Sequence, residues 1–392
     1  MKDYQHLNVS FLKALSVPLW DISNGEFKRK SISLPAWVIR EISRFIYYSI
    51  CTKPKVVKKE ASKSKLFFLR AYSRSDLNEH AGIFEAAIPA SSVCVLSQRD
   101  TTFDLLAISK CFCFMWIKRK EFQKILRKKF IPLFSQEGFF IFMTLVNALS
   151  DFFKIYPYLK RAPKVVSFQE MVPVENLVCQ VANMLGIPTY ALQHALGAYT
   201  DSGSYEARYS RVHYDASVCK TILVWGESTK KYFRKCTDAN IYLIGKPVLP
   251  SLSIFSEGVT FIFEADDDVN NKLLSLSDDI ESRGYEVSRW YRPGHKLVKD
   301  GVVREGPLRK MIIGWRSSLL VELGSIGGCV FVISESVFRD DLPQDLVVQN
   351  VNQIEDRYKM ICDYPYGVWK HFIDCTGQDT VNRYKSILET NE

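Results

Sequence analysis

The stretch Val165–Gly197, with the sequence VVSFQEMVPVENLVCQVANMLGIPTYALQHALG, decides the fold of this chain. Residues 165–168 form a short apolar run of strand type, and residues 173–185 follow with helical spacing behind a proline at the first helical position. The Gly-Ile-Pro that comes next ends the helix, and residues 189–192 form a second apolar run. This order predicts a parallel strand-helix-strand crossover, the building unit of an α/β sheet.

Three polar side chains of this stretch are candidates for chemistry. In open α/β sheets, ligands bind just outside the carboxyl ends of the strands. Glu170 follows the first strand, Glu175 lies in the first turn of the helix and His194 follows the second strand. We expect all three on one rim of a crevice, with Glu170 as the leading general base. The structural alternatives are an acid that stabilises a helix N-terminus, for Glu175, and a histidine satisfied within the fold, for His194.

The alternation of strands and helices continues along the chain and predicts an α/β fold with two Rossmann-like domains. A rigid Lys-Pro-Val-Leu-Pro segment separates two such series. We therefore expect an N-terminal domain at residues 1–247 and a C-terminal domain at residues 248–365. A helical tail follows at 366–392.

Three segments of the first domain carry more local expectations. Residues 9–12 are expected as a short strand and residues 53–65 as a basic surface loop. Residues 104–116 are apolar enough to predict a buried helix. The longest apolar run, residues 139–149, is shorter than the ~20 residues that cross a bilayer, so we expect no spanning segment.

Cysteine usage and the N-terminus indicate a cytoplasmic protein. The chain has 10 cysteines, but no pair has CxxC spacing and no secretory leader follows Met1. We expect reduced thiols rather than disulfides. A metal site is not expected, because no Cys/His cluster has ligand spacing.

Positive charge is concentrated at the N-terminal end. Residues 1–130 hold 24 Lys+Arg and 11 Asp+Glu, a net charge of +13, within a total of +9 for the chain. The segment Lys118–Phe130 (KRKEFQKILRKKF) places apolar residues on one helical face and cations on the rest. Such a helix can lie on an anionic membrane surface, so we expect the protein to bind peripherally to the inner face of the cytoplasmic membrane. The alternative is an ordinary surface helix. No nucleic-acid-binding motif is found.

The second domain contains a candidate phosphate site. Residues 314–322 read GWRSSLLVE, in which a strand feeds a turn of small residues into a helix with free backbone N–H groups. These groups suit a nucleotide phosphate, and Glu322 suits a ribose. His295, preceded by Arg292, follows the strand before this turn and is a second candidate phosphate ligand. The nucleotide-binding residues expected here are Gly314, Arg316, Ser317, Ser318, Glu322, Arg292 and His295.

The order of short motifs resembles GT-B glycosyltransferases of bacterial surface polysaccharide synthesis, such as capsule or O-antigen. FQEMVPVEN, GIPTYALQHALG, ILVWGESTKKYF, IGKP, RPGH and GWRSSLLVELGSIGG occur in that order between Val165 and Ile333. The resemblance implies two Rossmann-like domains with an interdomain cleft, of which residues 1–247 form the acceptor-side domain and residues 248–365 the nucleotide-sugar-binding domain. A His-Pro element followed by a Ser-Ser element is similar to sialyltransferases and Kdo transferases, which use CMP-sugars. Here the proline precedes the histidine, as Pro293-Gly294-His295.

The resemblance implies an inverting, metal-independent glycosyltransferase without a cofactor other than its nucleotide-sugar substrate. A CMP-sugar, such as CMP-sialic acid or CMP-Kdo, is favoured as donor, and a surface polysaccharide or lipid-linked glycan as acceptor. Three alternatives stay open: a CDP-polyol phosphotransferase, a UDP-sugar epimerase-like enzyme and a non-catalytic nucleotide- or glycan-binding partner.

Overall fold

The computed structural model describes two α/β units that are joined twice by the chain. The described residues are 9–16, 18–19, 39–40, 42–44, 46–58, 66–70, 75–88, 92–102, 104–132, 135–168, 172–193, 212, 215–246, 255–264, 267–291, 303–315, 318–336, 342–361 and 364–389.

The first unit is built on a seven-stranded sheet of order β1-β3-β2-β4-β5-β6-β7. All its pairs are parallel except β1 with β3. The strands are β1 Thr52–Lys58, β2 Phe67–Arg70, β3 Ser92–Thr101, β4 Val165–Ser167, β5 Thr189–Leu192, β6 Thr221–Val224 and β7 Asn240–Leu243. The helices are α2 Phe11–Ala14, α5 Ser75–Ala87, α6 Leu105–Ile117, α7 Arg119–Lys128, α8 Gln136–Leu159, α9 Pro173–Met184 and α11 Glu227–Cys236, with a π-helical turn, η1, at Ile46–Cys51.

Helices cover both faces of this sheet, because consecutive apolar side chains of its central strands point to opposite faces. In β2, Phe67 and Leu69 belong to the core cluster beneath α8 and α9, whereas Phe68 belongs to the opposite cluster with residues of α5. A strand buried on both faces reads as a continuous apolar run, which is why the central strands were predictable.

The second unit has a six-stranded sheet of order β10-β9-β8-β11-β12-β13, again parallel except at one edge, where β10 pairs antiparallel with β9. Its strands are β8 Ser256–Phe263, β9 Val287–Tyr291, β10 Val303–Glu305, β11 Arg309–Gly314, β12 Cys329–Ile333 and β13 Val347–Val348. The helical segments are α12 Asp267–Ser282, α13 Ser318–Ser325, η4 Gln344–Leu346, α14 Val351–Lys359 and η6 Tyr366–His371.

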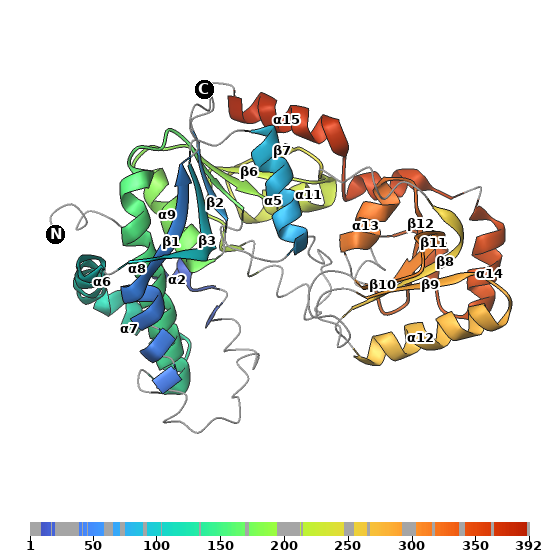
Figure 1. Ribbon diagram of the computed structural model, residues 1–392, viewed down its shortest axis with the longest axis horizontal. Helices are drawn as coiled ribbons and strands as arrows, with labels where there is room; N and C mark the ends of the chain where they lie inside the picture. The colour runs from blue at the N-terminus through green and yellow to red at the C-terminus, as the bar shows by residue number, and fades with distance from the viewer. Residues whose placement is uncertain are drawn as a thin grey trace.

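The last helix, α15 (Gly377–Glu389), returns to the first unit, where Figure 1 shows it above β6 and β7. Tyr384 and Leu388 of α15 are buried in the same cluster as Phe84 of α5. The α/β class and the two Rossmann-like domains expected from the sequence are confirmed. The domain limits at 247 and 365 stay predictions, although the first sheet ends at Leu243 and the second begins at Ser256.

Three local expectations were wrong. Residues 11–14 form a helix, α2, rather than a strand, because the Ser10 side chain caps it by accepting from the Lys13 N–H at 3.3 Å. Residues 53–58 of the expected loop belong to the edge strand β1, whereas residues 59–65 lie outside the described residues. An edge strand tolerates a proline and several lysines, so its sequence does not look like a strand. Helix α6 is buried on one side only.

Helix α8 contains the apolar run at residues 139–149 and extends beyond it at both ends. It has 24 residues and is long and apolar enough to cross a bilayer, the one such helix among the described segments. Most of its apolar stretch, 61%, is buried inside the protein. Its side chains pack with those of α6 and α9 in the first core cluster, so α8 behaves as a core helix.

Thiol reactivity tests this packing. Burial raises the pKa of the Cys111 thiol to about 12 and raises the pKa of Cys94 well above its usual value, whereas Cys236 is exposed. The thiolate is the reactive form, so we expect Cys236 to be labelled in seconds by a thiol reagent at neutral pH, with Cys94 and Cys111 protected until unfolding. Mass mapping of the labelled peptides measures this order. Equal labelling of Cys111 and Cys236 in the native protein would contradict the described core.

Candidate functional site

The structure describes only some of the side chains expected at the site. Gly314, Ser318, Glu175 and Glu322 lie within the described residues. The remaining candidates lie outside them: Glu170, His194, Arg292, His295, Arg316 and Ser317.

Glu175 is fully buried at the start of α9. Its Oε2 accepts a short hydrogen bond from the hydroxyl of Ser167, the last residue of β4. The carboxylate therefore ties the carboxyl end of β4 to the first turn of α9, where the helix dipole favours a negative charge. Glu175 therefore stabilises the carboxyl end of β4 from inside the fold. This geometry suits a positioning residue better than a base that must reach a substrate.

A side-chain hydrogen bond joins the neighbouring strands β5 and β6 at the same edge of the sheet. The buried Gln193 directly follows β5, and its Oε1 accepts a hydrogen bond of 2.7 Å from the backbone N–H of Trp225, just beyond β6. The ring of Trp225 belongs to the core cluster of the second unit, not of the first. The carboxyl edge of the first sheet therefore contacts the second unit directly.

His80 of α5 is a buried residue at this edge that the sequence analysis did not single out. Its Nε2 lies 3.2 Å from the hydroxyl of Tyr384 on α15. Its ring centroid lies 5.2 Å from that of Phe168, which follows β4, and 5.9 Å from that of Trp225. No local signal marks this residue, because its partners come from three distant segments.

In the second unit, α13 begins four residues after the end of β11 and packs against it. A Cβ on Gly314 would lie 2.9 Å from a methyl group of Leu320, so glycine permits the close packing of strand and helix. Ser318 is the first residue of α13, whose N-terminus therefore follows the carboxyl end of β11. Free backbone N–H groups at such a position can bind an anion.

Glu322, one turn into α13, is paired across the junction of the two units. Its carboxylate forms a short ion pair with the Nζ of Lys246, just beyond β7. The same ammonium lies 4.5 Å from the ring of Trp225. Glu322 was expected to contact a ribose; here it is held by a lysine 76 positions away in the chain.

The C-terminal segment completes the junction. The Asp374 N–H donates to the Trp225 carbonyl at 2.8 Å, and the Lys246 N–H donates to the Cys375 carbonyl at 3.0 Å. Trp225 and Lys246 follow the carboxyl ends of β6 and β7, and α13 follows the carboxyl end of β11. The carboxyl edge of the first sheet therefore contacts α13 and the C-terminal segment at this junction.

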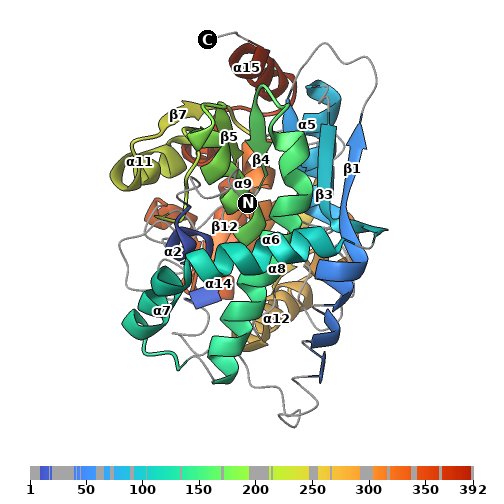
Figure 2. The same cartoon turned by 90° about the vertical axis from the view of Figure 1, so that its left-hand side faces the viewer.

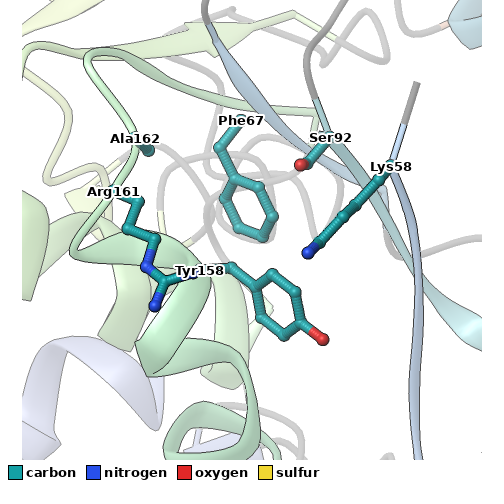
Figure 3. A pocket seen from close by; sticks show the side chains of 6 residues that line it. All are labelled: Lys58, Phe67, Ser92, Tyr158, Arg161 and Ala162. Carbon is teal, nitrogen blue, oxygen red and sulfur yellow. The ribbon is translucent and has the colours of Figure 1, made fainter. Parts of the chain in front are cut away.

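The described pockets lie elsewhere. One, of about 100 Å³, is lined by Phe67 and Ser92, the first residues of β2 and β3, and lies at their amino ends. Figure 3 shows Lys58 and Arg161 on opposite sides of the Phe67 and Tyr158 rings. A neighbouring pocket of about 350 Å³ shares Lys58, Tyr158 and Arg161. Neither pocket is the expected crevice. Within the described ranges, no three His, Cys, Asp or Glu side chains form a metal site.

No protein-family model matches the chain, and no curated protein matches it. Solved structures similar to it include a Staphylococcus aureus MnaA–UDP complex, at 11% identity and a TM-score of 0.46 over 83% of this chain and 97% of that one. A Neisseria meningitidis UDP-GlcNAc 2-epimerase bound to UDP-GlcNAc is similar at 13% identity and a TM-score of 0.45, over 83% and 98%. The trehalose-6-phosphate synthase OtsA is similar at 9% identity and a TM-score of 0.45, over 84% and 100%.

Proposed function

We propose that this chain is a GT-B glycosyltransferase that moves a sugar from a nucleotide-sugar donor to a surface-polysaccharide or lipid-linked glycan acceptor. The observation that carries the proposal is the junction, where the carboxyl edge of the first sheet contacts α13, the helix that follows the carboxyl end of β11. Ligands of open α/β sheets bind at these edges, and sites between domains are the usual place for a small-molecule substrate. A donor held by one edge and an acceptor held by the other would meet there.

The donor side is assigned to the start of α13. Its N-terminus and Ser318 would bind the donor phosphate, together with Arg316, Ser317, Arg292 and His295 as expected from the sequence. These groups would stabilise the negative charge that develops on the leaving nucleotide. A CMP-sugar is the favoured donor, on the resemblance of these motifs alone.

The acceptor side is assigned to the ends of β4 and β5. Glu170, or His194 in its place, would take the proton of the acceptor hydroxyl as its oxygen bonds to the anomeric carbon. The bond from that carbon to the phosphate oxygen breaks in the same step, which inverts the anomeric configuration. Glu175 would hold the end of β4 through Ser167 and so position Glu170.

Nucleotide binding tests the donor site. We expect CMP to raise the midpoint of thermal unfolding, since a ligand at a hundred times its Kd stabilises a protein by about 2.7 kcal/mol. CDP, UDP, GDP and dTDP should have smaller effects. The shift should be lost in Ser317→Ala and His295→Ala and reduced in Ser318→Ala. Ser325→Ala, at the far end of α13, is the matched control and should keep it.

The same panel separates the alternatives. A shift with UDP, and release of free sugar from a UDP-sugar without an acceptor, would favour the epimerase-like reading. A shift with CDP would favour a polyol phosphotransferase. If Glu170→Gln and His194→Ala keep both binding and biological function, the chain is a non-catalytic binding partner. No shift with any nucleotide would refute the proposal.

A further inference from the structure

Helix α6 exposes a row of large apolar side chains. One side of the helix is buried in the first core cluster, through Ala107, Cys111 and Phe114 among others. The other side is open: Leu106 is 64% exposed and Trp116 is 69% exposed. The large apolar side chains exposed on α6 are Leu105, Leu106, Phe112, Trp116 and Ile117, and Phe130 beyond α7 is 93% exposed. Several large apolar side chains exposed on one helix indicate an interaction site.

The next helix along the chain, α7, carries exposed cations. Together with the residue that follows the helix, they are Arg119, Lys120, Lys124, Arg127, Lys128 and Lys129. The acid of this helix, Glu121, is engaged by the Phe11 N–H at 2.9 Å and by Lys118 at 3.3 Å. It therefore offsets little of the positive potential. The Arg119 guanidinium lies 4.4 Å from the Trp116 ring and links the apolar row to the cations.

The apolar face of α7 itself is not available for binding. Phe122, Ile125 and Leu126 are buried in the first core cluster. The expectation that Lys118–Phe130 alone would lie on a membrane with its own apolar face is therefore corrected. The cations come from α7, but the exposed apolar side chains come from α6 and Phe130.

We propose that the surface formed by α6, α7 and Phe130 binds an anionic lipid bilayer, with the apolar row entering the interface. The charge argues for this partner, because exposed cations beside exposed apolar side chains complement anionic headgroups over acyl chains. Tryptophan and cations are also the residues that anchor proteins at the headgroup level. Figure 1 shows α6 and α7 at the end of the molecule opposite the second sheet, and Figure 2 shows α6 crossing the face turned toward the viewer. Binding there leaves the junction free, so the inference does not depend on the proposed donor site.

Vesicle flotation with the full chain tests this surface. We expect the protein to float with vesicles of phosphatidylcholine and phosphatidylglycerol but not with phosphatidylcholine alone, and added salt to weaken binding. Lys124→Glu/Lys128→Glu should lower the partition coefficient at least about tenfold, since each cation near the surface adds about a factor of five. Lys231→Glu/Lys235→Glu on α11, which changes two exposed lysines on another basic helix, should leave it unchanged.

A second pair of variants tests insertion. Leu106→Ser/Trp116→Ser should also lower binding about tenfold, whereas Leu274→Ser/Met360→Ser, which changes two exposed apolar residues of the second unit, should not. Trp116→Phe should remove the part of the fluorescence that brominated lipid quenches. All altered side chains are exposed, and a retained unfolding midpoint confirms folding.

Three outcomes would overturn the inference: no flotation of the wild type, equal loss in test and control variants, or no quenching of Trp116. If the wild type does not float but forms oligomers that Leu106→Ser/Trp116→Ser dissociates, the surface joins two copies of this chain instead. The nucleotide shift measured on the same variants reports on the donor site separately, so either proposal can fail alone.

Discussion

Gly245→Ala is expected to lower the free energy of unfolding by about 3 kcal/mol, because two costs add at this position. Gly245 has a φ of +77°, a conformation that costs an L-residue about 1–2 kcal/mol. Its Cβ would also lie 2.1 Å from the Cys375 carbonyl oxygen, and overpacking of this kind costs about 1–3 kcal/mol. The backbone of the returning C-terminal segment would have to move. Urea denaturation followed by circular dichroism measures the loss.

Matched glycines separate these two costs. Gly186 has a φ of +73° but nothing within 4 Å of its Cβ position, so Gly186→Ala should show the conformational cost alone. Gly226 has the opposite combination, with an extended backbone and the Phe372 carbonyl 2.3 Å from its Cβ position. Gly226→Ala should show the steric cost alone. If Gly245→Ala costs no more than Gly186→Ala, the close approach of the C-terminal segment is wrong.

Arg99→Ala is expected to destabilise the first unit by about 3–5 kcal/mol at neutral pH, because it leaves the carboxylate of Asp151 without its cation. Arg99 donates from both terminal nitrogens to the two Asp151 oxygens at 2.7 Å each, and its Nε donates to the Thr52 hydroxyl at 3.0 Å. These contacts join β1, β3 and α8. Arg99→Ala/Asp151→Ala should be less destabilised than Arg99→Ala, because the buried carboxylate that lost its guanidinium partner is then also removed.

The loss of unfolding free energy in Arg99→Ala should depend on pH. Burial raises the pKa of Asp151, and the Arg99 guanidinium opposes that shift. Without Arg99 the native pKa rises further above its value in the unfolded chain. A group of this kind adds stability at low pH, and that stability is lost as the pH rises through the native pKa. Urea midpoints should therefore show a smaller deficit at about pH 5 than at about pH 7.5. An equal deficit at both pH values would show that Asp151 does not carry the effect.

The central strands were predictable because they are buried on both faces and need only apolar residues. The apolar runs at residues 165–168 and 189–192 match strands β4 and β5 to within one residue. Edges were not predictable in this way. Strand β1 reads as a polar loop, because half of an edge strand faces water and its order comes from the pairing with β3.

In the candidate site too, some features were predictable from local sequence and others were not. The positions of Glu175 and Ser318 at helix starts followed from local signals. The burial of Glu175 beneath Ser167, the Glu322–Lys246 pair and the placement of His80 beside Tyr384 did not. Each depends on segments that are far apart in the chain.

By itself, the sequence determined the α/β class, the central strands and the helix that carries most charge, because each follows from side-chain periodicity within a segment. Only the tertiary structure decided which face of α6 and α7 is open, and which chain segments join the two units. Those outcomes depend on what packs against a segment. A local pattern of apolar and charged residues is the same whether its apolar face meets a core or solvent.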